Sequence, residues 1–240
     1  MAIDARARLV FALDYPSLSL ATAGASAVAG HVGLVKVGLE LFVQEGPAAL
    51  ALGDTADAGI FLDLKLHDIP ATVGRSVASV SRLADDGAPV RLLTVHASGG
   101  RAMLEEAVAQ ARGFEIVAVT VLTSLDADDL REMGVGGEVA DQVVRLARGA
   151  WEAGVRAFVC SPVEAPRLRD ALGPEAKLIT PGVRPAGAAS QDQKRVCTPT
   201  DAIGGGADML VVGRPIRDAD EPAAAADAIV AEIQRAAAPT

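Results

Sequence analysis

Residues 61–70 read FLDLKLHDIP, an apolar run interrupted by charged side chains. Because successive side chains of a β-strand point to opposite faces, Asp63 and Lys65 share one face and the leucines at 62, 64 and 66 take the other. Unpaired charge is costly inside a protein. The two charged groups therefore form a structural ion pair or are held for catalysis, and this segment alone leaves both readings open.

Seven further β-rich runs lie on either side of this strand. The eight strands are expected at 9–14, 34–38, 60–66, 91–97, 115–122, 157–161, 177–180 and 209–213. Segments rich in Ala, Leu, Glu and Arg lie between them and predict helices that include 18–29, 71–84, 101–110, 139–152 and 223–235. Alternation of strand and helix gives parallel strands with helical crossovers, and eight such units favour closure. We expect residues 1–240 to form a single (β/α)8 TIM barrel, with a doubly wound open sheet as the alternative.

Composition narrows the class of protein. The chain has 240 residues, half of them hydrophobic, which suits a barrel of about 250 residues. Its net charge of −9 disfavours broad contact with nucleic acid or an anionic membrane, since both are bound through clustered Lys and Arg. No apolar run approaches the roughly 20 residues of a membrane span, and we expect no signal peptide and a cytoplasmic location. Cys160 and Cys197 lack metal-ligand spacing and are expected to be small hydrophobic residues.

Nearly every predicted strand is apolar until its C-terminal end and then presents a charged or reactive group. In a barrel these ends meet at one mouth, where the active sites of this fold are built. The groups are Asp14, Lys36, Asp63 with Lys65, His96, Thr123 with Ser124, Arg184 and Arg214.

Lysine usage adds a second signal. Arg outnumbers Lys by 18 to 4, yet Lys36 and Lys65 both lie inside predicted strands. An ammonium group can deliver a proton, whereas arginine stays protonated. The two positions therefore suggest proton chemistry.

At residues 63–70 the sequence DLKLHDIP resembles the signature of the orotidine 5′-monophosphate decarboxylase family. The resemblance extends from about residue 9 to 216, with matching segments in the same order and spacing. These segments are ALD at 12–14, KVG at 36–38, VTVLTS at 119–124, PGVRP at 181–185, DQ at 192–193 and VGRP at 212–215.

The resemblance implies roles for particular residues. Lys36, Asp63, Lys65 and Asp68 would form a charged array, with Asp68 reaching into the site of the other subunit of a homodimer. At the ribose, the contacts would come from Asp14 with Lys36 and from Thr72 of the partner. At the pyrimidine, the contact would come from Thr123 or Ser124. At the phosphate, the contacts would come from Gln193, Gly213 and Arg214, and Arg184 would support the phosphate or the closing loop.

The resemblance also implies a reaction. Orotidine 5′-monophosphate would lose its C6 carboxylate as carbon dioxide, and Lys65 would protonate the carbanion to give uridine 5′-monophosphate. The reaction would need no cofactor and no metal. The segment 181–193, rich in Gly, Pro, Ala and Ser, is expected to be a mobile loop that closes over the phosphate.

Other motifs favour structural interpretations. His31 and His96 lack partners at metal-binding spacing, and His67 is expected to be structural although it lies inside the signature. The glycines at 204–206 precede a strand, so they suit a helix C-terminal turn better than a nucleotide-binding loop.

Two rival functions stay open. A sugar-phosphate decarboxylase or aldolase of the same superfamily would share the strand-three pattern, but such enzymes place a metal-assisting carboxylate in strand two, where this chain has Lys36. A non-catalytic barrel that binds a phosphate ligand is the second rival, and the complete lysine and aspartate array argues against it.

Overall fold

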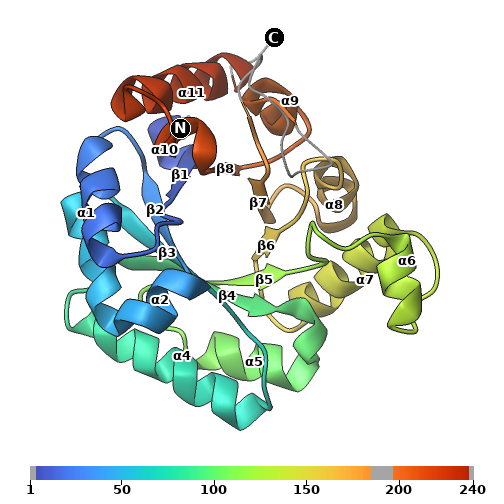
Figure 1. The fold of residues 1–240 in the computed structure, drawn as a ribbon. Coiled ribbons are helices and arrows are strands. Elements are labelled where there is room, and N and C mark those ends of the chain that lie inside the picture. Colours follow the sequence, from blue (N-terminus) through green and yellow to red (C-terminus); the bar gives the residue numbers. More distant parts are fainter. Residues whose placement is uncertain (1–3, 185–196, 238–240) are drawn as a thin grey trace.

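The computed structural model describes residues 4–184 and 197–237. Within these ranges eight parallel strands form a closed barrel in the order β1 to β8, and helices surround it (Figure 1). β1 pairs with β2 on one side and with β8 on the other, which closes the sheet. The predicted (β/α)8 barrel is confirmed, and the open sheet is wrong because its first and last strands would not pair.

All eight strands overlap their predicted ranges. They are β1 (Leu9–Ala12), β2 (Leu34–Gly38), β3 (Gly59–Leu66), β4 (Val90–His96), β5 (Glu115–Val119), β6 (Ala157–Val159), β7 (Lys177–Pro181) and β8 (Met209–Val212). β1 and β5 end earlier than expected, although the chain stays beside its neighbour for one more residue. Leu13 N donates to Lys36 O at 3.0 Å, and Thr120 N donates to Val159 O at 3.3 Å.

The long helices begin and end near the predicted residues. They are α1 (Leu18–Ala27), α4 (Pro70–Asp85), α5 (Arg101–Gln110), α7 (Val139–Glu152) and α11 (Pro222–Ala236). The sequence reading did not place the shorter helices, because four to eight residues give too few periodic positions. These are α2 (Leu39–Glu45), α3 (Leu52–Thr55), α6 (Ala127–Glu132), α8 (Ala165–Leu172), α9 (Pro199–Gly204) and α10 (Arg214–Arg217), with 3₁₀ turns at Arg6–Arg8, Gly46–Ala51 and Ala97–Gly99.

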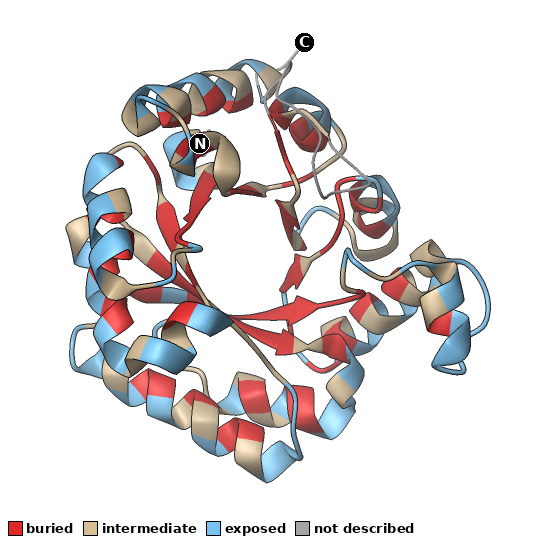
Figure 2. Ribbon diagram, viewed as in Figure 1, coloured by how far each residue is buried: buried red, intermediate tan, exposed pale blue. Residues whose placement is uncertain are grey.

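Two apolar clusters hold the barrel together, and Figure 2 shows the strands as mostly buried. The larger cluster fills the space between the outer face of the sheet and the helices. The smaller one fills the barrel interior with one or two side chains from each strand. Its buried members are Val10, Ala12, Leu34, Phe61, Leu92, Val117, Ala157, Ile179 and Val211. The interior is therefore a packed floor on which the strand ends rest, not a pore.

Proline and glycine define two helix ends that border the strands. Pro70 opens α4, where its missing N–H removes no helical hydrogen bond, so residues 67–69 form a short connection after β3. α9 ends at Gly204, and Gly206 has φ +98°, which confirms the predicted helix C-terminal turn.

Both cysteines are free, and burial raises the pKa of each thiol. In the described residues no helix is long and apolar enough to cross a membrane.

Candidate active site

Above the apolar floor, the same interior positions become polar towards the C-terminal ends of the strands. Two residues after Leu34 comes Lys36, two after Phe61 comes Asp63, and two after Leu92 comes Thr94. Since residues two apart share a face of a strand, these side chains form the next layer of the interior. The barrel thus supports a polar layer at its mouth.

Four of the predicted residues form a continuous charged array in this layer. Lys65 Nζ lies 2.7 Å from Asp63 Oδ2, and Lys36 Nζ lies 2.8 Å from Asp14 Oδ1. Lys36 Nζ is also 3.9 Å from Asp63 Oδ2, which joins the two pairs. Only 12% of the Lys36 side chain and 13% of the Asp63 side chain are exposed. The two charges of β3, Asp63 and Lys65, therefore face each other. With Asp14 and Lys36 they form a chain of contacts in the order Asp14, Lys36, Asp63, Lys65.

Strand β3 departs from a regular ladder at this array. Its register against β4 shifts between Leu62 and Leu66, and Lys65 has φ +51°, a left-handed conformation that L-residues rarely adopt. The backbone is therefore bulged at Lys65. The predicted division of side chains still holds, since Lys65 reaches Asp63 while Leu62, Leu64 and Leu66 pack in the outer apolar cluster.

Two small cavities border the array and share Asp14 and Lys36. One, of 110 Å³, is lined on its polar side by Asp63 and Lys65, together with Gly38 and Glu40. The other, of 230 Å³, is lined by the ends of β7 and β8. Its residues include Pro181, Arg184, Gly213, Arg214 and Arg217. The second cavity gathers three arginine residues in an otherwise acidic protein, which suits an anion such as phosphate, although the Arg217 guanidinium already pairs with Asp218.

The structure describes three of the four residues expected around the phosphate. Arg184 is buried and its backbone N–H donates to Cys197 O at 3.0 Å, which joins the two described segments that flank residues 185–196. Arg214 opens α10 directly after Gly213, so both follow the end of β8. Gln193 and most of the predicted closing loop lie outside the described residues.

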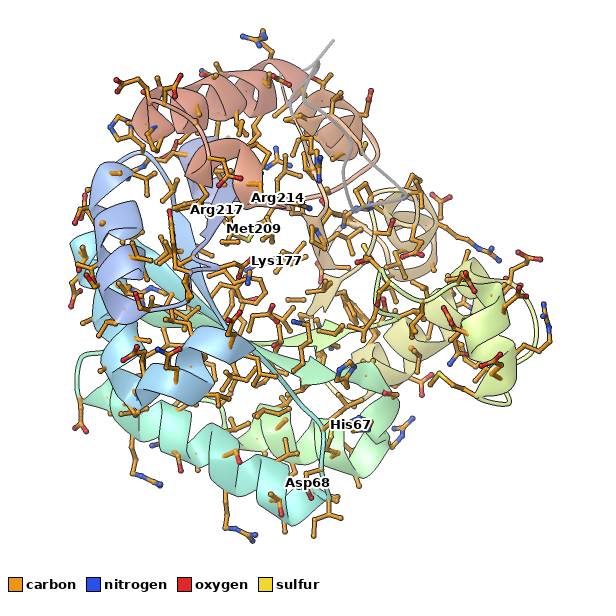
Figure 3. The ribbon with its side chains drawn as sticks, viewed as in Figure 1. His67, Asp68, Lys177, Met209, Arg214 and Arg217 are labelled. Carbon is orange, nitrogen blue, oxygen red and sulfur yellow. The ribbon has the colours of Figure 1, made fainter. Side chains whose placement is uncertain are left out.

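Asp68 and Thr72 do not line these two cavities. Asp68 is exposed in the connection after β3, where its Oδ1 accepts from Ile69 N at 2.6 Å. Thr72 lies in the first turn of α4, and its Oγ1 is 3.4 Å from Arg75. Figure 3 places Asp68 and His67 across the barrel from Arg214 and Arg217. Within one chain, then, Asp68 is separated from the anion-binding side.

Thr123 and Ser124 follow the end of β5 and are exposed. Neither lines the two cavities beside the array. The preceding Thr120 is buried, and its hydroxyl donates to Val159 O at 3.0 Å, so it links the end of β5 to β6.

A larger hollow of 710 Å³ lies at the other end of the barrel, by the N-terminal ends of the strands. Two of its basic residues have partners: Lys177 pairs with Glu115, and Arg8 donates to the carbonyls of Ala207 and Asp208 at 2.7 Å. No predicted site residue lines this hollow. Active sites of this fold lie at the opposite end, where the strands have their C-terminal ends and where the two smaller cavities are found.

Each of the three histidines lies against another titratable side chain. The rings of His67 and His96 are 5.4 Å apart and tilted, and His31 Nδ1 lies 2.8 Å from Asp227 Oδ1. Within the described ranges no group of three or more His, Cys, Asp or Glu side chains could hold a metal ion. Burial lowers the pKa of His96, and the neighbouring His67 and Lys65 lower it further, while Asp63 acts in the opposite direction.

One residue that the sequence reading missed belongs to the array. Thr94 of β4 is fully buried, and its hydroxyl donates to Asp63 Oδ1 at 3.0 Å. The sequence held a signal, since Thr94 occupies the interior face of strand four between apolar neighbours, but a threonine in a strand is too common to stand out.

The fold and site together define a class: a (β/α)8-barrel enzyme whose mouth carries alternating lysine and aspartate side chains beside an arginine-lined anion pocket. Comparison with known proteins narrows this class. Residues 7–229 match the model of the "Orotidine 5′-phosphate decarboxylase / HUMPS" family, and the chain belongs to that family.

Individual relatives agree with this assignment. Orotidine 5′-phosphate decarboxylase from Thermobifida fusca is 52% identical over 95% of this chain and 97% of its own length. The enzyme of the same name from Anaeromyxobacter sp. strain K is 54% identical over 93% of this chain and 97% of its own. The crystal structure of orotidine 5′-phosphate decarboxylase from Lactobacillus acidophilus superimposes with a TM-score of 0.81 at 35% identity, covering 94% of this chain and 98% of that one.

The lowered pKa of His96 makes a pH-dependent prediction. In the unfolded chain this imidazole takes a proton near pH 6.5, whereas the folded protein binds it only at lower pH. Because the unfolded state then binds more protons, the contribution of His96 to the free energy of unfolding should fall as the pH drops through about 6.5. NMR titration should give His96 a midpoint below about 6.5, and His96→Gln should weaken the pH dependence in this range. A midpoint at or above the ordinary value would contradict the effect of burial.

Proposed function

We propose that this chain is a cofactor-independent carboxy-lyase that converts orotidine 5′-monophosphate into uridine 5′-monophosphate and carbon dioxide, the last step of de novo UMP synthesis. The observation that carries the proposal is the continuous Asp14–Lys36–Asp63–Lys65 array beside the arginine-lined cavity. We treat residues 1–240 as one catalytic barrel domain, and we expect the enzyme in the cytoplasm.

The substrate is anchored through its phosphate. Arg214, Gly213 and Arg184 line the cavity at the ends of β7 and β8. This cavity would receive the phosphate. Guanidinium groups match phosphate geometry, which lets a protein of net charge −9 bind an anion locally. Asp14 and Lys36 line both cavities, so they are suited to hold the ribose between the phosphate and the base. Gln193 would add a phosphate contact, and Thr123 or Ser124 a contact to the pyrimidine.

The chemistry takes place at Lys65 and Asp63. The bond from C6 to the carboxylate breaks, its electron pair stays on C6 as a carbanion, and neutral carbon dioxide leaves. The Lys65 ammonium stabilises the developing charge and transfers a proton to C6, after which solvent restores the lysine. Lys36 adds a second positive charge at the same Asp63 oxygen, since its Nζ lies 3.9 Å from Oδ2. Binding energy from the distant phosphate contributes by ordering the site around the reacting carbon.

The donor set argues against the metal-dependent rival. Asp63 lies within 4 Å of two ammonium groups, 2.7 Å from Lys65 and 3.9 Å from Lys36. A divalent cation at the same carboxylate would be repelled by both lysines. Lys36 also stands in strand two where that rival would need a carboxylate.

A homodimer with shared sites would account for Asp68 and Thr72. Asp68 lies just before α4 and Thr72 in its first turn, and neither lines the cavities beside the array of its own chain. Large apolar side chains are exposed at Ile69, next to Asp68, by 65%, and on α2 at Leu39 by 54% and Val43 by 76%. A two-fold interface over this surface would cover them, and each Asp68 would extend towards the partner's Lys65.

The central test is the assay of purified protein with orotidine 5′-monophosphate in the presence of EDTA, following ultraviolet absorbance and carbon dioxide release. The wild-type protein should convert the nucleotide without added metal. Lys65→Ala should lower kcat at least about 1,000-fold, because both the proton and the positive charge are lost.

Lys177→Ala is the matched control, since Lys177 pairs with Glu115 at the opposite end of the barrel. It should leave kcat and KM close to wild type. Circular dichroism and UMP binding must show that both variants are folded. Lys65→Ala with near wild-type turnover would refute the assignment of Lys65 as the acid.

Substituting Arg214 tests the phosphate end. Arg214→Ala should raise KM by roughly 10- to 100-fold, because a charge-assisted contact to phosphate is removed. Uridine without the phosphate should bind wild type and variant equally. An unchanged KM would mean that the phosphate binds elsewhere.

Mixing inactive subunits tests the shared site. Lys65→Ala and Asp68→Ala homodimers should each be nearly inactive. If Asp68 acts in the partner's site, an equal mixture after subunit exchange should recover about a quarter of wild-type activity, since half the dimers carry one intact site. Native mass spectrometry must confirm the exchange. If confirmed mixed dimers recover no activity, Asp68 does not act between subunits.

A further inference from the structure

The register between β3 and β4 leaves one residue of β4 opposite the bulge. Leu62 pairs with Leu93, and the next pair is Leu66 with Val95. Between these pairs β3 carries residues 63, 64 and 65, whereas β4 carries only Thr94. The regular backbone ladder is therefore interrupted where the two reactive side chains of β3 are presented.

The Thr94 side chain supplies contacts that the ladder does not. Its Oγ1 accepts from the Lys65 backbone N–H at 2.8 Å and donates to Asp63 Oδ1 at 3.0 Å. The hydroxyl thus holds the backbone of one reactive residue and the carboxylate of the other. Asp63 keeps its second oxygen, Oδ2, for Lys65 Nζ at 2.7 Å. One side chain fixes both ends of the Asp63–Lys65 pair.

Packing alone does not account for a threonine here. Thr94 is fully buried, and its neighbours along β4 are Leu93 and Val95. Valine has the same shape and no hydroxyl to desolvate, so it would fill the space without needing polar partners. The hydroxyl has both its donor and its acceptor capacity used, and one partner is a charged group.

The backbone at Lys65 needs such a restraint. A lysine at φ +51° lies in a sparsely populated region and persists only where surrounding contacts determine it. The hydrogen bond from Lys65 N–H to Thr94 is a contact that acts directly on this peptide unit. Without it the bulge can relax, and the ammonium group would leave its position against Asp63.

We propose that Thr94 is a positioning residue of the decarboxylation site, whose hydroxyl locks the β3 bulge so that Lys65 and Asp63 are held in their reactive arrangement. Thr94 lines neither cavity beside the array, and it acts through Lys65 and Asp63. The inference rests on the proposed function for its kinetic consequence. The structural role at the Lys65 amide stands apart from any substrate.

The experiment compares Thr94→Val, which removes the hydroxyl at constant shape, with Thr94→Ser, which keeps it. Thr94→Val should lower kcat by about 10- to 100-fold, as for loss of precise positioning, while KM and UMP binding change less than about threefold. Thr94→Ser should recover most of the lost kcat. Equal losses in both variants, or a loss confined to KM, would overturn the proposal.

Thr120→Val is the matched control. Thr120 is also a buried threonine near a strand end, but its hydroxyl donates to Val159 O and not to the array. It should cost thermal stability comparable to Thr94→Val and leave kcat near wild type. If Thr120→Val lowers kcat as much as Thr94→Val, the effect is general loosening of the barrel. Thr94→Ala replaces Thr94→Val if the valine variant does not fold.

Hydrogen exchange gives a readout that does not depend on turnover. The Lys65 amide should exchange at least about tenfold faster in Thr94→Val than in wild type or Thr94→Ser, because its acceptor is lost, and Thr120→Val should not change it. Unaltered exchange would overturn the role of Thr94 even if the enzyme is active. If the wild-type protein fails to decarboxylate the nucleotide, the proposed function fails, and the exchange still decides the structural claim.

Discussion

The Asp63 carboxylate is the contact on which the site depends. One oxygen accepts from the Thr94 hydroxyl, and the other faces the ammonium groups of Lys65 and Lys36 at 2.7 and 3.9 Å. A carboxylate that is 13% exposed is stable as an anion only where such partners surround it. Its position in turn fixes both lysines. Residues that follow β1 and lie on β2, β3 and β4 at the mouth are therefore linked through one carboxylate.

This arrangement needs a rigid support, which the barrel interior supplies. Phe61 and Leu92 fill the layer below Asp63 and Thr94, so the polar layer rests on a packed apolar floor. Closure through β1 and β8 brings Asp14 and Gly213 near each other although they are distant in sequence. The arginine-lined cavity and the charged array thus become neighbours at one mouth of the barrel.

Much of this could be predicted from the sequence, and the exceptions have physical reasons. The eight strands, the charged strand ends and the pairing of Asp63 with Lys65 follow from local periodicity. The bulge at Lys65 could not be predicted, since it arises from the mismatch between β3 and β4. Thr94 was missed for the same reason, because its importance lies in what faces it across the sheet. The short helices such as α2 and α10 were too brief to show a period.

The sequence by itself determined the order of strands and helices, the polar residues at the strand ends and the family, because these depend on residue types at fixed spacing. Only the tertiary structure decided which of those residues meet. It joined Asp14, Lys36, Asp63 and Lys65 into one array and kept Asp68 apart on the exposed start of α4. Contacts between strands depend on register and closure of the whole barrel, and no single segment of sequence contains that information.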